Sequence, residues 1–190
     1  MADQDDNSAG AAAVQRIFAA AQFAAEKHSS QKRKGAAGEP YINHLIEVAE
    51  LIAGSSPVLD ANLLMAGLLH DTIEDTGATA QELEQRFGAD VTSLVLEVTD
   101  DKSLPKATRK ALQVQNAPKK SVRAQVLKLA DKISNLRSIL ERPPADWDLE
   151  RKRQYFEWAK QVVDGLTSPN PILKAEFERL YARLDELVAK

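Results

Sequence analysis

The chain has 190 residues, 44% of them hydrophobic and 28% charged, a balance typical of one soluble globular domain. Its formal net charge of −3 argues against a general nucleic-acid binder, because a surface that follows phosphates carries a basic excess. It contains no cysteine, so disulfides and thiolate zinc sites are excluded and any metal must be bound by His, Asp or Glu.

The N-terminal stretch MADQDDNSAG is acidic, whereas a secretory signal begins with positive charge followed by an apolar run. No apolar stretch approaches the length needed to span a membrane. The sequence therefore predicts a cytoplasmic protein without a membrane or nucleic-acid partner. We expect residues 1–8 to form a flexible tail and residues 9–190 to form a single domain.

Helical spacing of apolar residues, interrupted by Gly and Pro, divides the chain into segments, and no convincing alternating strand is present. We therefore predict an all-α fold of about eight to ten helices in one domain. The expected helices cover about residues 11–30, 41–54, 57–70, 79–87, 90–98, 105–116, 121–140, 147–166 and 171–189.

The stretch LLHDTIEDTG, residues 68–77, places four groups that can bind a metal or transfer a proton directly after an apolar run. On a helix, His70 and Glu74 share a face, as do Asp71 and Asp75, because each pair is four residues apart. Since the Thr-Gly pair after Asp75 ends the helix, we expect all four groups to lie at its end.

Two further segments add candidate ligands. His44 lies within PYINHLIEVA, and Asp131 lies within VLKLADKISNLRS with Asn135 one turn later. Two imidazoles and two carboxylates suit manganese, iron or another borderline divalent ion better than calcium, which prefers oxygen alone. Glu74 and Asp75 would lie beside such an ion, where they could handle protons.

Each of these residues also has a purely structural interpretation. A single His in an apolar helix is usually a core residue, and a His-Asp doublet arises by chance. Asp131 lies opposite the main apolar stripe of its helix, which favours a solvated face. However, Ala124, Leu127, Ser134 and Ser138 lie on the same side as Asp131, so that face is predicted to be covered.

Four short basic clusters, QKRKG, KSLPKATRK, APKK and ERKR, would ordinarily be solvated faces. Arg33 and Lys34 differ because they precede a glycine in a loop, where ligand contacts are common. An arginine there could stack on a base or bind a phosphate.

Taken in order, five segments resemble the HD superfamily of metal-dependent phosphohydrolases, and more closely the hydrolase domain of RelA/SpoT homologues. The resemblance is strongest over residues 25–165 and is greatest to the stand-alone small alarmone hydrolases, the group that includes the animal SpoT homologue. It does not extend to a synthetase domain, which implies a hydrolase only. The segments are RKGAAGEPYINHLIEVAELI, AGLLHDTIEDT, FGADVTSLVLEVTDDKSLPKATRKALQ, LKLADKISNLRS and YFEWAKQVV.

The resemblance implies an HD fold over residues 9–190 and an enzyme that removes the 3′-diphosphate of (p)ppGpp with one Mn²⁺ ion, giving GDP or GTP and pyrophosphate. It implies Glu74 and Asp75 as the catalytic pair, with the glutamate activating water. The implied metal ligands are His44, His70, Asp71 and Asp131. The implied substrate-binding residues are Arg33, Lys34, Lys106, Asn135, Arg151 and Tyr155.

The sequence leaves two alternatives open. An HD phosphohydrolase of another nucleotide, such as (p)ppApp, NADPH or a deoxynucleotide, would use the same metal and acids. A non-catalytic alarmone binder is the second alternative, although it would not need both the ligands and the Glu-Asp pair. Leu45 stands where the family usually has proline, and the GAAGE loop varies in length among relatives, which leaves the base preference open.

Overall fold

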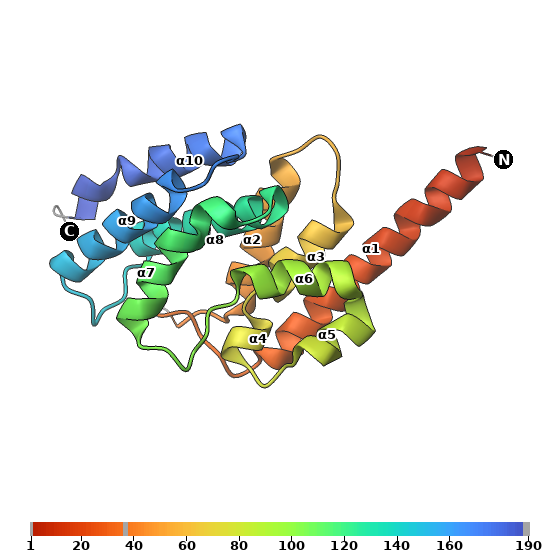
Figure 1. The fold of residues 1–190 in the computed structure, drawn as a ribbon, viewed down its shortest axis with the longest axis horizontal. Helices are drawn as coiled ribbons and strands as arrows, with labels where there is room; N and C mark the ends of the chain where they lie inside the picture. The colour runs from red at the N-terminus through yellow and green to blue at the C-terminus, as the bar shows by residue number, and fades with distance from the viewer. Residues whose placement is uncertain (1, 36–37, 188–190) are drawn as a thin grey trace.

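The computed structural model describes residues 2–35 and 38–187, and for residues 2–9 it describes the backbone only. The described residues are helical apart from their connections, and their one β-type pairing is an isolated bridge between Lys32 and Pro40. The all-α prediction is therefore confirmed (Figure 1). The helices are α1 Ala2–Lys27, α2 Ile42–Gly54, α3 Ala61–Leu69, α4 Thr72–Asp75, α5 Ala80–Phe87, α6 Ala89–Val98, α7 Lys106–Asn116, α8 Val122–Glu141, α9 Leu149–Asp164 and α10 Pro171–Tyr181, with short 3₁₀ helices at Ala117–Lys119 and Leu184–Leu187.

Side-chain caps determine where several helices begin. We expected the third helix to start near Pro57, but it starts at Ala61 because the Asp60 carboxylate accepts a hydrogen bond from the Leu63 amide. Ser121 caps α8 in the same way, and Asn170 caps α10 with a proline at the first helical position. The predicted last helix ends at Tyr181, and residues 188–190 lie outside the described part of the chain.

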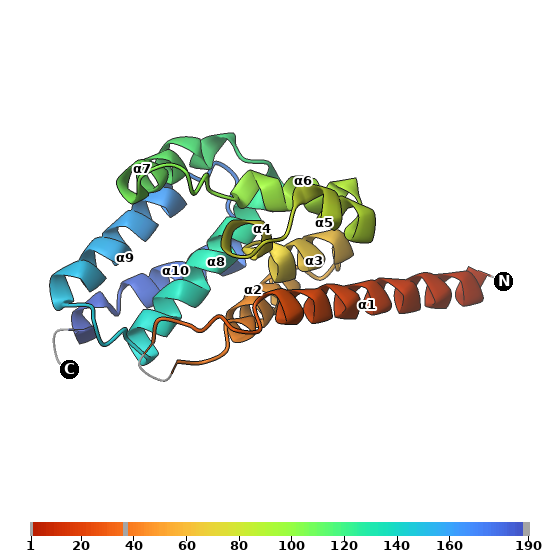
Figure 2. The ribbon, with the colours of Figure 1, turned by 90° about the horizontal axis from the view of Figure 1, so that it is seen from below.

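Helix α8 runs through the middle of the molecule and packs against α2, α3, α6, α9 and α10 (Figure 2). Its side chains at Leu127, Leu129, Ile133 and Leu136 are fully buried. Asp131 is also buried, at 8% exposure, which confirms that its face is covered rather than solvated. Burying a carboxylate in the central helix is costly unless it is paired, so this position indicates a function.

Helices α2 and α3 approach each other unusually closely at Gly67. A Cβ atom at Gly67 would lie 2.9 Å from Cδ1 of Ile52 and 3.5 Å from Cα of Ala49. The absence of a side chain therefore allows α3 to lie directly against α2. This contact brings the end of α3, where His70 lies, next to the start of α2, where His44 lies.

The HDTIED stretch, which we expected to lie on one helix, is divided between the end of α3 and the short helix α4. His70 follows the last residue of α3, and Asp71 precedes α4 with φ −97° and ψ −2°. These angles lie at the edge of the helical region, and His70 and Asp71 form a turn between the two helices. The four groups of the HDTIED stretch therefore lie on a helix junction rather than on one helix.

The first helix extends further than the sequence indicated. The expected start near residue 11 is replaced by a start at Ala2, since the alanine-rich segment that follows favours helix and contains no proline. The N-terminal half of α1 projects from the rest of the molecule (Figures 1 and 2). Among the helices that the structure describes, none combines the length and apolar character needed to cross a membrane.

Candidate metal centre and substrate cleft

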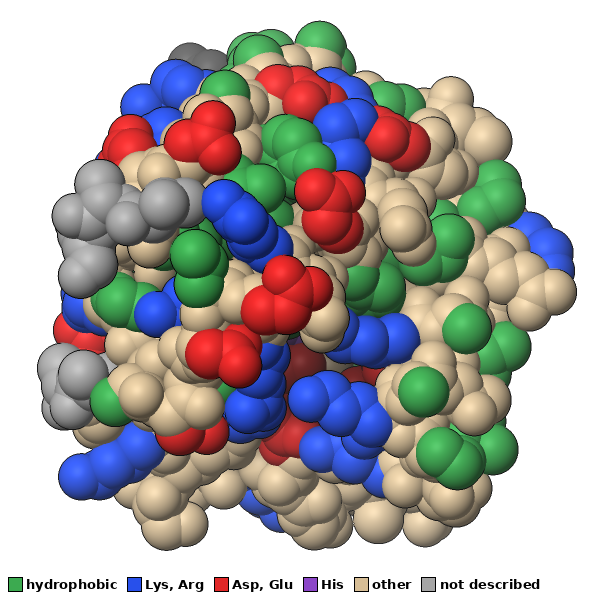
Figure 3. Space-filling view, turned by 90° about the vertical axis from the view of Figure 1, so that its left-hand side faces the viewer, with side chains coloured by type: hydrophobic (Ala, Val, Ile, Leu, Met, Phe, Trp, Pro, Cys, Tyr) green, Lys and Arg blue, Asp and Glu red, His purple; other side chains and the backbone are tan. Residues whose placement is uncertain are grey.

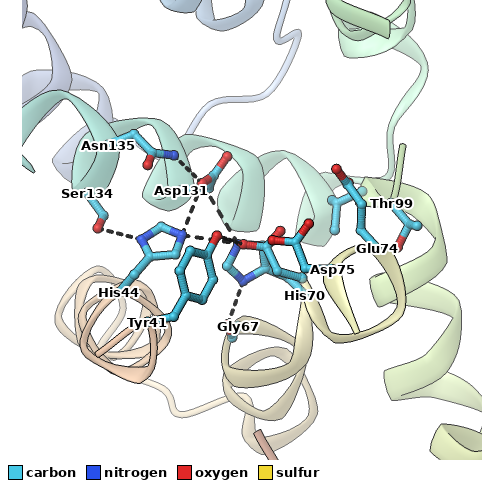
Figure 4. A network of polar contacts seen from close by, with 12 residues as sticks. Tyr41, His44, Gly67, His70, Glu74, Asp75, Thr99, Asp131, Ser134 and Asn135 are labelled. Carbon is cyan, nitrogen blue, oxygen red and sulfur yellow. Dashed lines mark hydrogen bonds and ion pairs between the residues drawn. The ribbon is translucent and has the colours of Figure 1, made fainter. Parts of the chain in front are cut away.

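Three of the four predicted metal ligands converge on one buried point. His44 comes from α2, His70 from the end of α3 and Asp131 from α8, and one ligand atom from each lies within 4.8 Å of the others. Oδ1 of Asp131 is 3.5 Å from Nε2 of His44 and 3.8 Å from Nε2 of His70. Figure 4 shows the two imidazoles below Asp131.

Asp71, the fourth predicted ligand, faces the same two nitrogens. Its Oδ2 atom lies 3.1 Å from Nε2 of His70 and 3.7 Å from Nε2 of His44. The same oxygen accepts a 2.6 Å hydrogen bond from the hydroxyl of Tyr41, which the sequence analysis did not identify. The turn at Asp71 thus directs its carboxylate toward the imidazoles.

Hydrogen bonds on the far side of each imidazole determine which nitrogen faces the carboxylates. Nδ1 of His70 donates to the carbonyl of Gly67 at 2.8 Å. Nδ1 of His44 donates at 2.8 Å to Oγ of Ser134, whose hydroxyl in turn donates to Glu47 at 2.6 Å. In the neutral imidazoles both Nε2 atoms therefore carry the lone pair, and both face Asp71 and Asp131.

Neither Nε2 atom has a hydrogen-bond partner among the described residues, although both are buried. A buried polar nitrogen without a partner is unfavourable unless another ligand satisfies it. Two imidazole lone pairs and two carboxylates around one point are the donor set of a divalent cation. The residues therefore fit a metal ion.

The pKa shifts of these residues also fit a site that binds a cation. Burial lowers the pKa of both imidazoles, but the carboxylates of Asp71 and Asp131 raise that of His70 to about 9, while that of His44 stays lowered. Burial would raise the pKa of Asp71, but His70 and then His44 lower it below its ordinary range. The site thus favours positive charge, which a proton or a metal ion can supply.

The predicted catalytic pair lies beside this group. Oε2 of Glu74 accepts from the Asp100 amide at 3.0 Å, while Oε1 lies 3.7 Å from Lys102 and from Arg109. Burial is the main cause that raises the pKa of Glu74, so this carboxylate is a stronger base than a solvated one.

Asp75 is held from two sides. Its Oδ2 atom accepts from the Gln31 amide at 2.8 Å, and Oδ1 accepts from Lys102 at 2.5 Å. Gln31 in turn contacts Nδ1 of the buried His28 at 2.6 Å. These contacts fix the orientation of the Asp75 carboxylate.

A cleft of about 730 Å³ opens above the metal group, a volume in the range of nucleotide-sized sites. Figure 3 shows a hollow with Lys and Arg side chains at its rim and Asp and Glu side chains within it. The structure brings together in this cleft all the residues predicted to bind substrate, along with both predicted catalytic acids. They are Arg33, Lys34, Glu74, Asp75, Lys106, Asn135, Arg151 and Tyr155.

Arg33 and Asn135 connect the loop before α2 to the metal group. Nη1 of Arg33 donates to Oδ1 of Asn135 at 3.1 Å, and the Asn135 amide donates to Oδ1 of Asp131 at 2.6 Å. The guanidinium of Arg33 also lies 5.8 Å from the centre of the Tyr41 ring. The arginine is thus positioned across the cleft beside the metal group.

Three of the other predicted binding residues, Lys106, Arg151 and Tyr155, lie on the wall formed by α7 and α9. Arg151 lies over the ring of Trp147 at 4.5 Å, and Tyr155 packs between Trp147 and Trp158. Burial, followed by the charges of Arg151, Lys34 and Arg109, lowers the pKa of Lys106. Cations crowded in this way favour a highly negative ligand.

Sequence reasoning missed several cations that line the cleft: Lys102, Arg109, Lys110, Lys128 and Lys132. A signal existed for two of them, because Arg109 and Lys110 follow Lys106 by three and four residues and so share its helix face. No comparable signal existed for Lys128 and Lys132, whose exposure depends on what packs around α8. Tyr41 was missed for the same reason.

A model of the HD domain family matches residues 20–156. The chain belongs to the HD domain family. It is 47% identical over 165 residues to a guanosine-3′,5′-bis(diphosphate) 3′-pyrophosphohydrolase, MESH1, of Xenopus tropicalis, a match that covers 87% of this chain and 92% of the relative. The corresponding human protein is 49% identical over 166 residues, covering 87% and 93%.

A solved structure supports the same family. It is described as "A metazoan ortholog of SpoT hydrolyzes ppGpp and plays a role in starvation responses", and it superposes with a TM-score of 0.85 at 45% identity, covering 88% of this chain and 94% of its own. The predicted resemblance to small alarmone hydrolases is thereby confirmed. HD-domain hydrolases are metal-dependent, and His44, His70 and Asp131 form a group of the required kind.

Proposed function

We propose that this HD-domain protein hydrolyses the 3′-diphosphate of (p)ppGpp, giving GDP or GTP and pyrophosphate. The observation that carries the proposal is the position of the buried metal group at the base of a cationic cleft, with the Glu74–Asp75 pair beside it. The names of the relatives at 47–49% identity describe the same reaction.

We infer that His44, His70, Asp71 and Asp131 hold one Mn²⁺ ion. Manganese accepts a mixed set of imidazole and carboxylate ligands, and four protein ligands leave coordination positions open. When bound, such an ion lowers the pKa of a bound water molecule and polarises a phosphoryl oxygen.

The remaining chemistry is assigned to Glu74 and Asp75. Glu74 takes a proton from the attacking water, and its raised pKa improves it as a base. Water attacks the phosphorus attached to the ribose 3′ oxygen, the bond between that phosphorus and oxygen breaks, and the oxygen takes up a proton. Asp75, fixed by Gln31 and Lys102, orients the reacting groups.

Residues of the cleft walls bind the rest of the nucleotide. Arg33 lies on the purine, and Asn135 holds Arg33 beside the metal group. Lys34, Lys106 and Arg151 bind the 5′-phosphates, for which their crowded positive charge is suited. Tyr155 forms the floor of this part of the cleft with its two tryptophan neighbours. Because arginine stacks on any purine, (p)ppApp is the second substrate to test.

A substrate panel with product analysis tests the proposal. Purified protein with Mn²⁺ is incubated separately with ppGpp, ppApp, NADPH, a deoxynucleoside triphosphate and GTP, and the products are separated by ion-exchange chromatography. We expect GDP and pyrophosphate from ppGpp in one step, and almost no turnover of GTP, which lacks a 3′-diphosphate. Stepwise release of orthophosphate, or faster turnover of NADPH or the deoxynucleotide, would contradict the proposal.

A further inference from the structure

Two buried lysines flank Asp131 on α8, and the proposed function so far assigns them nothing. Lys128 is 5% exposed and Lys132 is 2% exposed, yet both line the cleft. Burying an ammonium group costs several kcal/mol by order of magnitude unless it is paired, so a buried lysine at the base of a cleft requires an explanation.

The two lysines differ in how they are paired. Nζ of Lys132 donates to Oδ2 of Asp131 at 3.0 Å and lies 4.4 Å above the ring of Trp158, so its charge is balanced by a metal ligand. Lys128 makes one hydrogen bond among the described residues, a 3.3 Å contact from Nζ to the carbonyl of Val98. An ammonium group has three donors, so Lys128 retains donating capacity at the cleft surface.

The position of Lys128 is on the metal side of the cleft. It precedes Asp131 by three residues, about one turn of α8, and its carbonyl partner Val98 is the last residue of α6. The chain continues from Val98 to Asp100, whose amide holds Glu74 at 3.0 Å. Lys128 therefore lies between the metal group and the segment that positions the catalytic glutamate.

The charges that influence Lys128 and Lys106 differ, and Lys110 lies between the two, since burial, then Lys106 and Lys132, lower its pKa. Burial and Lys132 lower the pKa of Lys128, while Asp131, Asp100 and Asp71 oppose this shift. The pKa of Lys106 is instead lowered by burial, followed by the charges of Arg151, Lys34 and Arg109. The region around Lys128 adjoins the metal ligands, and the region around Lys106 adjoins the wall formed by α7 and α9.

The proposed substrate carries two diphosphate groups, one on the 3′ and one on the 5′ oxygen. Two groups of cations, one near the metal ligands and one near the wall formed by α7 and α9, suit such a molecule. If the reacting phosphorus lies at the metal group, the terminal phosphate of the 3′-diphosphate is one bridging oxygen away from it. That phosphate therefore needs a cation close to the metal ligands, and the 5′-diphosphate occupies the more distant region. A monophosphate on the 3′ oxygen would leave the nearer cation without a partner.

We propose that Lys128 binds the terminal phosphate of the 3′-diphosphate and so determines the preference for a diphosphate over a monophosphate at that position. This inference rests on the proposed function. The ammonium of Lys128 donates its free N–H groups to the terminal phosphate, which provides the charged partner that the buried lysine lacks among the described residues.

Binding measurements that do not depend on turnover test this role. The Glu74→Gln variant is loaded with Mn²⁺, and calorimetry gives its Kd for ppGpp and for guanosine 5′-diphosphate 3′-monophosphate. The same pair is measured after adding Lys128→Met. We expect the second change to raise the Kd for ppGpp roughly 10- to 100-fold, the usual effect of losing a charged hydrogen bond, and to leave the Kd for the monophosphate nearly unchanged.

A matched control is Lys34→Met, which removes a lysine from the other region. It should raise the Kd values of both nucleotides by the same factor. Lys128→Met also removes the cost of burying a charge, so its unfolding midpoint should stay equal or rise. If Lys128→Met folds poorly, Lys128→Gln is measured in its place. Metal content, measured by atomic emission, should match that of the parent.

If Lys128→Met raises the Kd values of both nucleotides by the same factor, or raises neither, the assignment of Lys128 is overturned. Turnover of ppGpp by the unaltered protein is measured separately. Its absence would count against the proposed function, whereas the comparison of two Kd values would still decide where the terminal phosphate binds.

Discussion

Ser134 receives a hydrogen bond from His44 across 90 positions of the sequence, with 2.8 Å between Oγ and Nδ1. The Ser134 hydroxyl donates onward to Glu47, which is paired with Arg137 at 2.6 Å. Because Ser134 accepts from Nδ1, the Nε2 lone pair of His44 is available for a metal. Such indirect contacts orient a ligand and raise its basicity.

We therefore predict that Ser134→Ala weakens Mn²⁺ affinity by about 10- to 100-fold, the usual cost of losing a contact that orients a ligand. Competition with a fluorescent chelator measures this directly, without reference to turnover. Ser138→Ala, one turn further along α8, is the matched control and should leave the affinity unchanged. An unaltered affinity in Ser134→Ala would show that packing alone orients His44.

Replacing Asp131 tests the metal group itself. Asp131→Asn keeps the shape of the side chain but removes the charge that attracts a cation to the two Nε2 atoms. We expect the variant to lose both bound metal and activity, and excess chelator should abolish turnover of the unaltered protein. Asp100→Asn removes another carboxylate of the same cleft and should retain its metal. Full metal content in Asp131→Asn would remove Asp131 from the site.

The role of Glu74 is tested by Glu74→Gln. The variant should retain metal and nucleotide binding but lose on the order of 10²–10⁴ in kcat, the range of general acid–base assistance. Loss of metal from a normally folded variant would instead make Glu74 a ligand.

The pH profile gives an independent test of the same base. Glu74 must be ionised to accept a proton, and burial raises its pKa above the ordinary value of 4.5. Activity should therefore fall as pH decreases through this raised pKa and be fully present above it. In Glu74→Gln the residual activity should lack this acidic limb. If the limb persists in the variant, it belongs to another group.

Arg33→Ala tests contact with the nucleotide. Among the described residues, the side chain contacts Asn135 and the ring of Tyr41 rather than a metal ligand itself, so metal content should not change. We expect KM for ppGpp to rise roughly tenfold, the equivalent of about 1.4 kcal/mol. Arg86→Ala, which removes an exposed arginine packed on Phe23 away from the cleft, should leave KM unaltered. An unchanged KM in Arg33→Ala would refute the stacking role.

The sequence by itself determined the fold class and the kind of site. Apolar spacing and helix breakers depend on neighbouring residues, so they identified most helices of the all-α fold, although not the start of α3 at Ala61. The HDTIED stretch indicated metal chemistry because ligand-type side chains rarely follow a buried apolar run without a function. All the site residues that the family resemblance implied lie in the metal group or line the cleft above it.

Only the tertiary structure decided how these residues meet. Periodicity placed Asp131 away from the main apolar stripe, but its burial depends on five helices that pack around α8. The hydrogen bond between Asp71 and Tyr41 and the contact of the buried Lys128 ammonium with Val98 likewise join segments 30 positions apart. A local pattern shows which side chains share a face, whereas packing between distant segments decides which face is buried and which charges must pair.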